Sequence, residues 1–124
     1  MPKNGYVWFE LSDDRYDVAI SGQTFEHNPF FWVTFCEMAR ILKPGGVLFV
    51  IAPGGGRVHR FPYDCWRFYP DSWGALCTLS GMHLVETYFE KDSTAAQGVR
   101  RQVARQRGDR DQAEDLGCRT IVLQ

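Results

Sequence analysis

The chain has 124 residues, which is enough for one domain with a modest core, and nothing in it indicates a second domain. Its formal net charge of −1 gives no general electrostatic attraction to nucleic acid or to an anionic membrane. No uninterrupted apolar stretch reaches the length of a membrane span, and the first residues do not resemble a signal peptide. We therefore expect a single cytoplasmic domain over residues 1–124, with neither nucleic acid nor a membrane as a partner.

Two segments in the first part of the chain have the composition of β-strands. Residues 6–11 are aromatic and apolar, and a polar turn separates them from a β-branched run over residues 17–22. We predict a strand over residues 17–22 and an additional strand over residues 6–11.

A helix is predicted over residues 29–42. Asn28 offers a side-chain oxygen as its N-cap, and Pro29 stands at the first helical position, where its missing N–H is no loss. Pro44 and the glycines after it end the helix. Residues 47–52 then form an apolar run that is typical of a strand covered on both faces. The right-handed crossover of such a βαβ unit makes its two strands parallel.

The predicted helix is apolar over most of its circumference. Its polar residues form a single stripe at helical spacing, which consists of Thr34, Glu37 and Arg40. The line that faces the core consists of Phe31, Phe35, Met38 and Leu42. The remaining apolar surface indicates a further contact, with a neighbouring helix as the simplest partner.

The second half of the chain contains two further strands, a helix and a charged insertion. A helix over residues 70–80 begins at a proline and ends before a glycine, and an alternating strand follows over residues 82–90. Residues 91–116 form a charged insertion without an aromatic side chain, which we expect to be partly helical near residues 95–106 and otherwise mobile. A last strand is predicted over residues 118–123.

Two parts of the sequence resemble class I S-adenosylmethionine-dependent methyltransferases. The first comprises residues 16–18, the Phe-Glu-His of residues 25–27, and residues 37–46, which end in a Leu-Lys-Pro-Gly-Gly turn. The second, residues 59–70, is similar to a subgroup of small-molecule methyltransferases often associated with cell-surface polysaccharide genes. The resemblance covers roughly residues 12–90. It implies an α/β fold with a partial Rossmann-like methyltransferase sheet, in which the last strand runs antiparallel to its neighbours.

Two motifs of that family are absent from the sequence. In the family, a glycine-rich turn follows the first strand and lets the backbone approach the cofactor, and an acidic residue after the second strand holds the ribose hydroxyls. Residues 54–56 are three glycines, but they follow the wrong strand and lack the family's spacing. The resemblance therefore implies the C-terminal half of a methyltransferase domain, with S-adenosylmethionine as cofactor and with only half of the pocket for it.

Five residues at the end of strand 17–22 are the first site candidates. By resemblance, Ser21, Gly22 and Gln23 border the methionine part of the cofactor, although the same residues suit an ordinary strand end with a tight turn. Glu26 and His27 are the catalytic candidates, because His is a base near neutral pH and Glu can orient it. Adjacent residues on a turn also often serve only to cap the next helix.

A metal site is not expected from the sequence. Some members of the resembled family bind magnesium with a Glu-x-x-Glu-His pattern, but Gln23 stands where the first glutamate would be, so that a carboxylate ligand is missing. The four cysteines, Cys36, Cys65, Cys77 and Cys118, are widely spaced without a C-x-x-C pair. We predict buried thiols rather than disulfides or a zinc site.

A long loop over residues 52–69 carries the substrate-binding candidates. It lies beyond the carboxyl end of a parallel strand, where open α/β sheets bind ligands. His59, Arg60 and Arg67 are candidates for contacting a carboxylate, phosphate or sugar hydroxyl of an acceptor. Arg67 also stands three residues after Asp64, a spacing at which the two side chains can pair with each other instead.

The sequence thus indicates an S-adenosylmethionine-dependent methyltransferase-like protein with a small-molecule acceptor, for example a sugar, that is inactive as an incomplete domain. The alternative is a non-catalytic interaction module derived from a methyltransferase. Without a strand beside it, segment 17–22 would be a bare sheet edge, and such edges recruit partners. Either residues 6–11 fold back as an antiparallel cap, or the edge pairs with a second copy or a complementing chain. We favour a homodimer.

Overall fold

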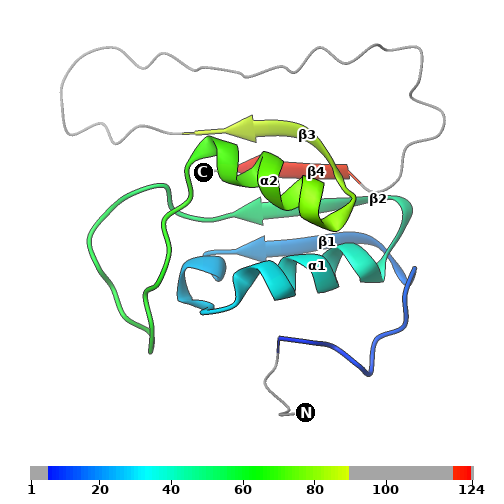
Figure 1. Ribbon diagram of the computed structural model, residues 1–124, viewed down its shortest axis with the longest axis horizontal. Coiled ribbons are helices and arrows are strands. Elements are labelled where there is room, and N and C mark those ends of the chain that lie inside the picture. Colours follow the sequence, from blue (N-terminus) through cyan, green and yellow to red (C-terminus); the bar gives the residue numbers. More distant parts are fainter. Residues whose placement is uncertain (1–5, 90–118, 124) are drawn as a thin grey trace.

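The computed structural model describes residues 6–89 and 119–123, so the charged insertion predicted over residues 91–116 lies outside the described residues. The described strands form one sheet in the order β1-β2-β4-β3, in which every pair of neighbours is parallel. The strands are β1 (Tyr16–Gly22), β2 (Leu42–Ile51), β3 (His83–Tyr88) and β4 (Arg119–Leu123). Helices α1 (Phe31–Ile41) and α2 (Pro70–Ser80) lie over the same face of this sheet (Figure 1).

The predicted βαβ unit is confirmed. β1 pairs with β2 in parallel, with Ala19 opposite Leu48 and Ser21 opposite Val50, and α1 is the connection between them. β2 begins at Leu42, earlier than the predicted residues 47–52, because a register shift lets Tyr16 pair with Leu42 ahead of the regular ladder.

The start of α1 differs from the prediction of residues 29–42. The Asn28 side-chain oxygen accepts a hydrogen bond from the Phe30 N–H (2.9 Å), and its amide nitrogen donates to the Thr34 hydroxyl (2.7 Å). Asn28 thereby closes a turn that contains Pro29, and the helix begins only at Phe31. The polar stripe is also interrupted, because Thr34 is buried under this turn rather than exposed to solvent.

Residues 6–11 form bends and turns, so the strand predicted there is wrong. Polar side chains of α1 bind this backbone in place of a neighbouring strand. Glu37 accepts the Trp8 N–H (2.8 Å), while Arg40 donates to the carbonyl oxygens of Trp8 (3.0 Å) and Leu11 (2.9 Å). The segment therefore packs on α1 and does not cap the edge of β1.

The direction of the last strand also differs from the expectation. The resemblance implied an antiparallel strand over residues 118–123, whereas β4 lies between β2 and β3 and is parallel to both. A parallel connection needs a dozen or more residues, and the interval of the sequence between Tyr88 and Arg119 is long enough for one. Helix 70–80 is confirmed, with Pro70 at its start and Gly81 in the left-handed conformation (φ 72°) after its end.

The core lies between the sheet and the two helices. Its largest fully buried side chains include Trp73 of α2, Phe35 of α1 and Leu48 of β2. Phe25, at the start of a short 3-10 helix after β1, and Phe68, on the loop after β2, belong to the same core. These two rings anchor the segments that follow β1 and β2, and they thereby position the residues around them.

The opposite face of the sheet carries exposed apolar side chains on β1. Val18 and Ile20 alternate with the helix-facing Ala19 and are 50% and 71% exposed. Within the described residues, β1 pairs only with β2, so that its other edge has no neighbouring strand. None of the described helices is of a length and apolarity that would let it span a lipid bilayer.

The Glu37 carboxylate gives a pH-dependent test of how residues 6–11 are held. Hydrogen bonds from the Arg40 guanidinium, and then from the Trp8 N–H, hold the pKa of Glu37 below its usual range. A lowered pKa stabilises the fold above the pKa of the unfolded chain, about 4.3, and this contribution is lost as the pH falls. We expect Glu37→Gln to lose about 1–2 kcal/mol of unfolding free energy at pH 7 and progressively less as the pH falls below about 4, measured by urea denaturation.

The matched control is Glu10→Gln, which changes an exposed glutamate on the same segment. It is expected to leave the unfolding free energy unchanged. A Glu37→Gln deficit that is equally large at pH 3 and pH 7 would contradict the role of the charge.

Candidate functional site

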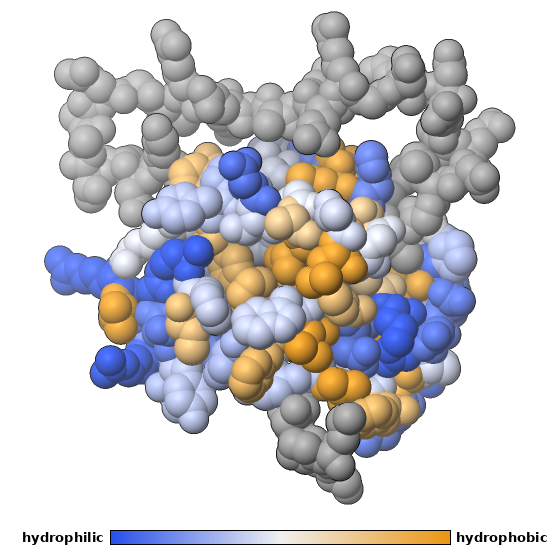
Figure 2. All heavy atoms as spheres, viewed as in Figure 1, coloured by the Kyte–Doolittle hydropathy of each residue, from blue (hydrophilic) through white to orange (hydrophobic). Residues whose placement is uncertain are grey.

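The candidate site lies where β1 and β2 end. Because the strands are parallel, their carboxyl ends meet at one side of the sheet. β1 is followed there by the short 3-10 helix η1 (Phe25–His27), and β2 by the loop over residues 52–69 (Figure 1). Hydrophilic residues predominate on this side of the molecule, whereas apolar and polar residues are mixed over the helices (Figure 2).

The end of β1 forms the tight turn expected there. Gln23 has a left-handed backbone (φ 48°), and its N–H donates to the Ile51 carbonyl (2.7 Å). The Thr24 hydroxyl donates to the Gly22 carbonyl (2.9 Å). A Cβ atom at Gly22 would meet nothing within 4 Å, so the space beside this backbone is open. Ser21 faces the helices opposite the buried Val50.

Glu26 is fully buried, with 0% of its surface exposed, and neither carboxylate oxygen has a hydrogen-bond partner among the described residues. Its backbone explains the position, because the Glu26 carbonyl accepts the N–H groups of Cys65 (2.7 Å) and Trp66 (3.3 Å). The buried ring of Phe25 anchors the preceding residue. Buried carboxylates are normally hydrogen-bonded, so the lack of such a bond marks Glu26 as a functional candidate.

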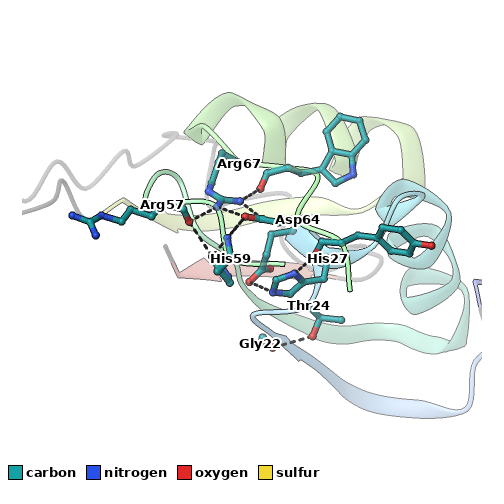
Figure 3. Close-up of polar contacts among 10 residues, drawn as sticks. Gly22, Thr24, His27, Arg57, His59, Asp64 and Arg67 are labelled. Atoms are coloured by element: carbon teal, nitrogen blue, oxygen red, sulfur yellow. Dashed lines mark hydrogen bonds and ion pairs between the residues drawn. The ribbon is translucent and has the colours of Figure 1, made fainter. Parts of the chain in front are cut away.

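His27 and His59 lie beside each other, with ring centroids 4.9 Å apart and planes nearly perpendicular (Figure 3). The Nδ1 atom of His27 bonds the Tyr63 carbonyl, and that of His59 bonds the Arg57 carbonyl (3.1 Å). A carbonyl only accepts, so Nδ1 is the hydrogen donor in each ring, which in a neutral imidazole leaves the lone pair on Nε2. The His27 Nε2 atom lies 3.7 Å from a Glu26 oxygen.

Arg67 and Asp64 hold the loop in shape. Two guanidinium nitrogens of Arg67 bond both oxygens of Asp64, whose side chain is 1% exposed, and Arg67 also donates to the Arg57 carbonyl (3.0 Å). These bonds, followed by the His59 N–H, hold the pKa of Asp64 far below its usual range. Asp64 is in turn the main reason that the pKa of Arg67 is raised, with a smaller contribution from the charge of Glu26.

The structure thus brings Glu26, His27 and His59 together and places the other candidates around them. Arg67 is engaged within the loop, in the pairing with Asp64 that its spacing allowed, and Arg60 is exposed. Their contact with an acceptor stays a prediction. Sequence reasoning did not find that His59 joins Glu26 and His27, since no local spacing connects residues on the two separate segments.

Aromatic side chains pack together where the loop meets α1. The Trp66 ring contacts the rings of Phe31 (5.4 Å) and Trp32 (5.9 Å), and its indole N–H donates to the Asn28 carbonyl (3.0 Å). Tyr63 is 56% exposed on the same loop. Part of the apolar surface of α1 is thus covered by the loop, and not by the neighbouring helix that was expected as its simplest partner.

The cysteines agree only partly with the prediction of buried thiols. Cys77 is buried and Cys36 is half-buried, but Cys65 is exposed because it lies on the loop rather than in the core. Cys118 lies outside the described residues.

A hollow elsewhere on the surface is separate from this site. Its lining includes Asp13, which precedes β1, and Gly81, which precedes β3. Arg40 and Leu42, which also line it, lie just before and at the start of β2. It therefore lies at the amino ends of the strands, opposite to the end where α/β sheets bind ligands.

Comparison with known proteins identifies part of this architecture. Residues 8–50 match the family model of a methyltransferase domain, a stretch that includes β1, α1 and nearly all of β2. This stretch is therefore similar to part of a methyltransferase domain, in agreement with the sequence resemblance. No curated protein and no solved structure matches the chain. The family generally uses S-adenosylmethionine as its methyl donor.

The described residues fit only one end of that cofactor. The open space beside Gly22 suits the approach of a small group to the backbone at the end of β1. Ser21, Gly22 and Gln23 would border it there. Within residues 6–89 and 119–123, no exposed acidic residue directly follows a strand to hold ribose hydroxyls. The fit is thus limited to the methionine part.

Replacing Arg67 tests whether the loop depends on the Asp64 ion pair. In Arg67→Met the buried Asp64 carboxylate retains only the hydrogen bond from the His59 N–H. We therefore expect the melting temperature to fall by about 5–10 °C. Hydrogen exchange should rise mainly in residues 52–69. Arg57→Met is the matched control, because only the backbone of Arg57 makes contacts in Figure 3. Equal melting temperatures for both variants would show that the pair does not hold the loop.

Proposed function

We propose that this chain carries the acceptor side of an S-adenosylmethionine-dependent methyltransferase that acts on a small hydroxylated molecule such as a sugar. The observation that supports it is the group formed by Glu26, His27 and His59. It lies at the carboxyl ends of β1 and β2, and two of its three members come from the segment that matches the methyltransferase domain.

Methyl transfer depends mainly on positioning an acceptor against the methyl group that S-adenosylmethionine supplies when bound. Ser21, Gly22 and Gln23 would border the methionine end of that cofactor. Glu26 and His27 form the end of the site that acts on the acceptor, directly or through an ion that they bind. His59 and Arg60 supply donors for acceptor hydroxyl or anionic groups, and the exposed ring of Tyr63 offers a surface for a sugar face.

We further propose that the chain binds the cofactor only weakly by itself and that a second polypeptide supplies the remaining contacts. The fit of the described residues to the methionine end alone supports this. Each hydrogen bond to a charged group is worth roughly 1.5–3 kcal/mol, so several missing bonds weaken binding by orders of magnitude.

Calorimetry with S-adenosylmethionine and a methylation assay test this proposal. The chain alone should show no micromolar binding and no turnover, whereas a complex with a copurified partner should release S-adenosylhomocysteine. In that complex, Gly22→Val fills the open space at the end of β1 and should abolish turnover. Gly74→Ala adds a Cβ in equally open space on α2 and should retain it. Micromolar binding by the chain alone, or full activity of Gly22→Val in the complex, would refute the respective proposal.

A second function, as an interaction module, is favoured by one observation. β1 has a strand on one side only within the described residues, and its Val18 and Ile20 side chains are exposed. Exposed apolar edge strands recruit a further strand from another chain. We propose that β1 joins a second copy of this chain or a complementing polypeptide.

The size of the protein in solution tests this pairing. We expect a dimer at micromolar concentration by light scattering, and at least about tenfold weaker association for Ile20→Lys, because the charge would be placed in an apolar contact. Leu79→Lys changes a similarly exposed apolar residue on α2 and should remain dimeric. A wild-type chain that stays monomeric at all concentrations removes the homodimer.

A further inference from the structure

Three potential metal-binding side chains converge at the carboxyl ends of β1 and β2. One carboxylate oxygen of Glu26 and one ring nitrogen each of His27 and His59 all lie within 4.8 Å of one another. Two of these ligands come from η1 and the third from the loop after β2. Apart from this trio, no comparable group of His, Cys, Asp and Glu occurs in the described part of the chain.

The Glu26 carboxylate is the observation that points to a bound cation. It is fully buried and both of its oxygens lack hydrogen-bond partners within the described residues, while the guanidinium of Arg67 is engaged by Asp64. A buried carboxylate is stable when it is paired or when it coordinates a metal. The Nε2 atom of His27 lies 3.7 Å from one of these oxygens.

The two histidines are oriented as metal ligands usually are. Metal-binding imidazoles donate the hydrogen of their second nitrogen to a carbonyl or carboxylate, which fixes the tautomer and the ring. Here His27 does so to the Tyr63 carbonyl and His59 to the Arg57 carbonyl. Asp64 lies behind His59, with an oxygen 3.7 Å from its Nδ1 atom. In the neutral form of each ring this hydrogen bond leaves the Nε2 lone pair for an ion.

We propose that Glu26, His27 and His59 bind a divalent transition metal ion, with Zn²⁺ as the representative. Two imidazole nitrogens and one carboxylate oxygen suit Zn²⁺ and related ions rather than Mg²⁺ or Ca²⁺, which prefer oxygen ligands. No metal site was expected from the sequence, because Gln23 stands where the family pattern has a glutamate. In the structure the third ligand comes instead from His59, on a different segment.

The geometry requires only a small adjustment. Tetrahedral Zn²⁺ with bonds of about 2.1 Å separates its ligand atoms by about 3.4 Å. The Glu26 and His27 atoms, at 3.7 Å, are already near this spacing. The His59 side chain is 56% exposed and lies on a loop, so it is free to close the remaining distance, which is at most about 1.4 Å because the ligand atoms lie within 4.8 Å of one another.

Such an ion would join η1 to the loop and leave a fourth position open for water or an acceptor oxygen. The inference deepens the proposed function by giving Glu26 and His27 a way to act on the acceptor. It nevertheless rests on ligand geometry alone, and binding of the metal is measured without any methylation. Its failure and that of the proposed function are therefore distinguishable.

Calorimetry of the full, reduced chain with Zn²⁺ tests the site. We expect one ion per chain, and at least about a 100-fold loss of affinity in His59→Ala and in Glu26→Gln. His83→Ala is the matched control, because His83 is an exposed histidine on β3 outside the cluster, and it should bind as the wild type does. Cys65→Ser should also retain binding, since the thiol is not in the ligand set. Mg²⁺ in excess should not displace Zn²⁺.

Melting temperatures separate loss of binding from loss of folding. Without metal, His59→Ala should have the same melting temperature as the wild type because the His59 side chain is exposed. The melting temperature of Glu26→Gln should not be lower than that of the wild type, because a neutral amide replaces a buried charge. Added Zn²⁺ should raise the melting temperature of the wild type and of His83→Ala but not of these two variants. Unchanged Zn²⁺ affinity in His59→Ala, or its loss in His83→Ala or Cys65→Ser, would overturn the proposal.

Discussion

The parallel pairing of β1 with β2 is the constraint on which the rest of the structure depends. Parallel strands need a crossover, and α1 provides it while burying Phe35 and Met38 against the sheet. The same pairing brings two carboxyl ends together, so η1 and the loop after β2 become neighbours. The candidate site exists because of this topology, since neither segment holds all three of its central side chains.

The aromatic core continues from the helices into the site. Phe25 begins η1 and Phe68 ends the loop, and both rings are buried with Trp73, on which Phe68 stacks at 5.0 Å. Glu26 therefore follows directly after a core anchor, which explains how a carboxylate is held away from solvent. Packing energy from the core stabilises a polar arrangement that would be unfavourable by itself.

The two buried carboxylates, Asp64 and Glu26, differ in their hydrogen bonding. Asp64 is fully engaged by Arg67 and by the His59 N–H, and it shapes the loop. Glu26 has no hydrogen-bond partner among the described residues, although it is at least as deeply buried. Asp64 therefore stabilises the loop. Glu26 is the carboxylate that is a candidate for a function of the site.

The sequence by itself determined the βαβ unit, helix α2 and the methyltransferase resemblance, because proline, glycine and apolar periodicity act locally and are read directly. It also allowed the pairing of Asp64 with Arg67 from their spacing. Only the tertiary structure decided that residues 6–11 bind to α1 through Glu37 and Arg40, and that β4 lies parallel between β2 and β3. The grouping of His59 with Glu26 and His27 was likewise tertiary, because contacts between distant segments depend on strand order and core packing, which no local pattern encodes.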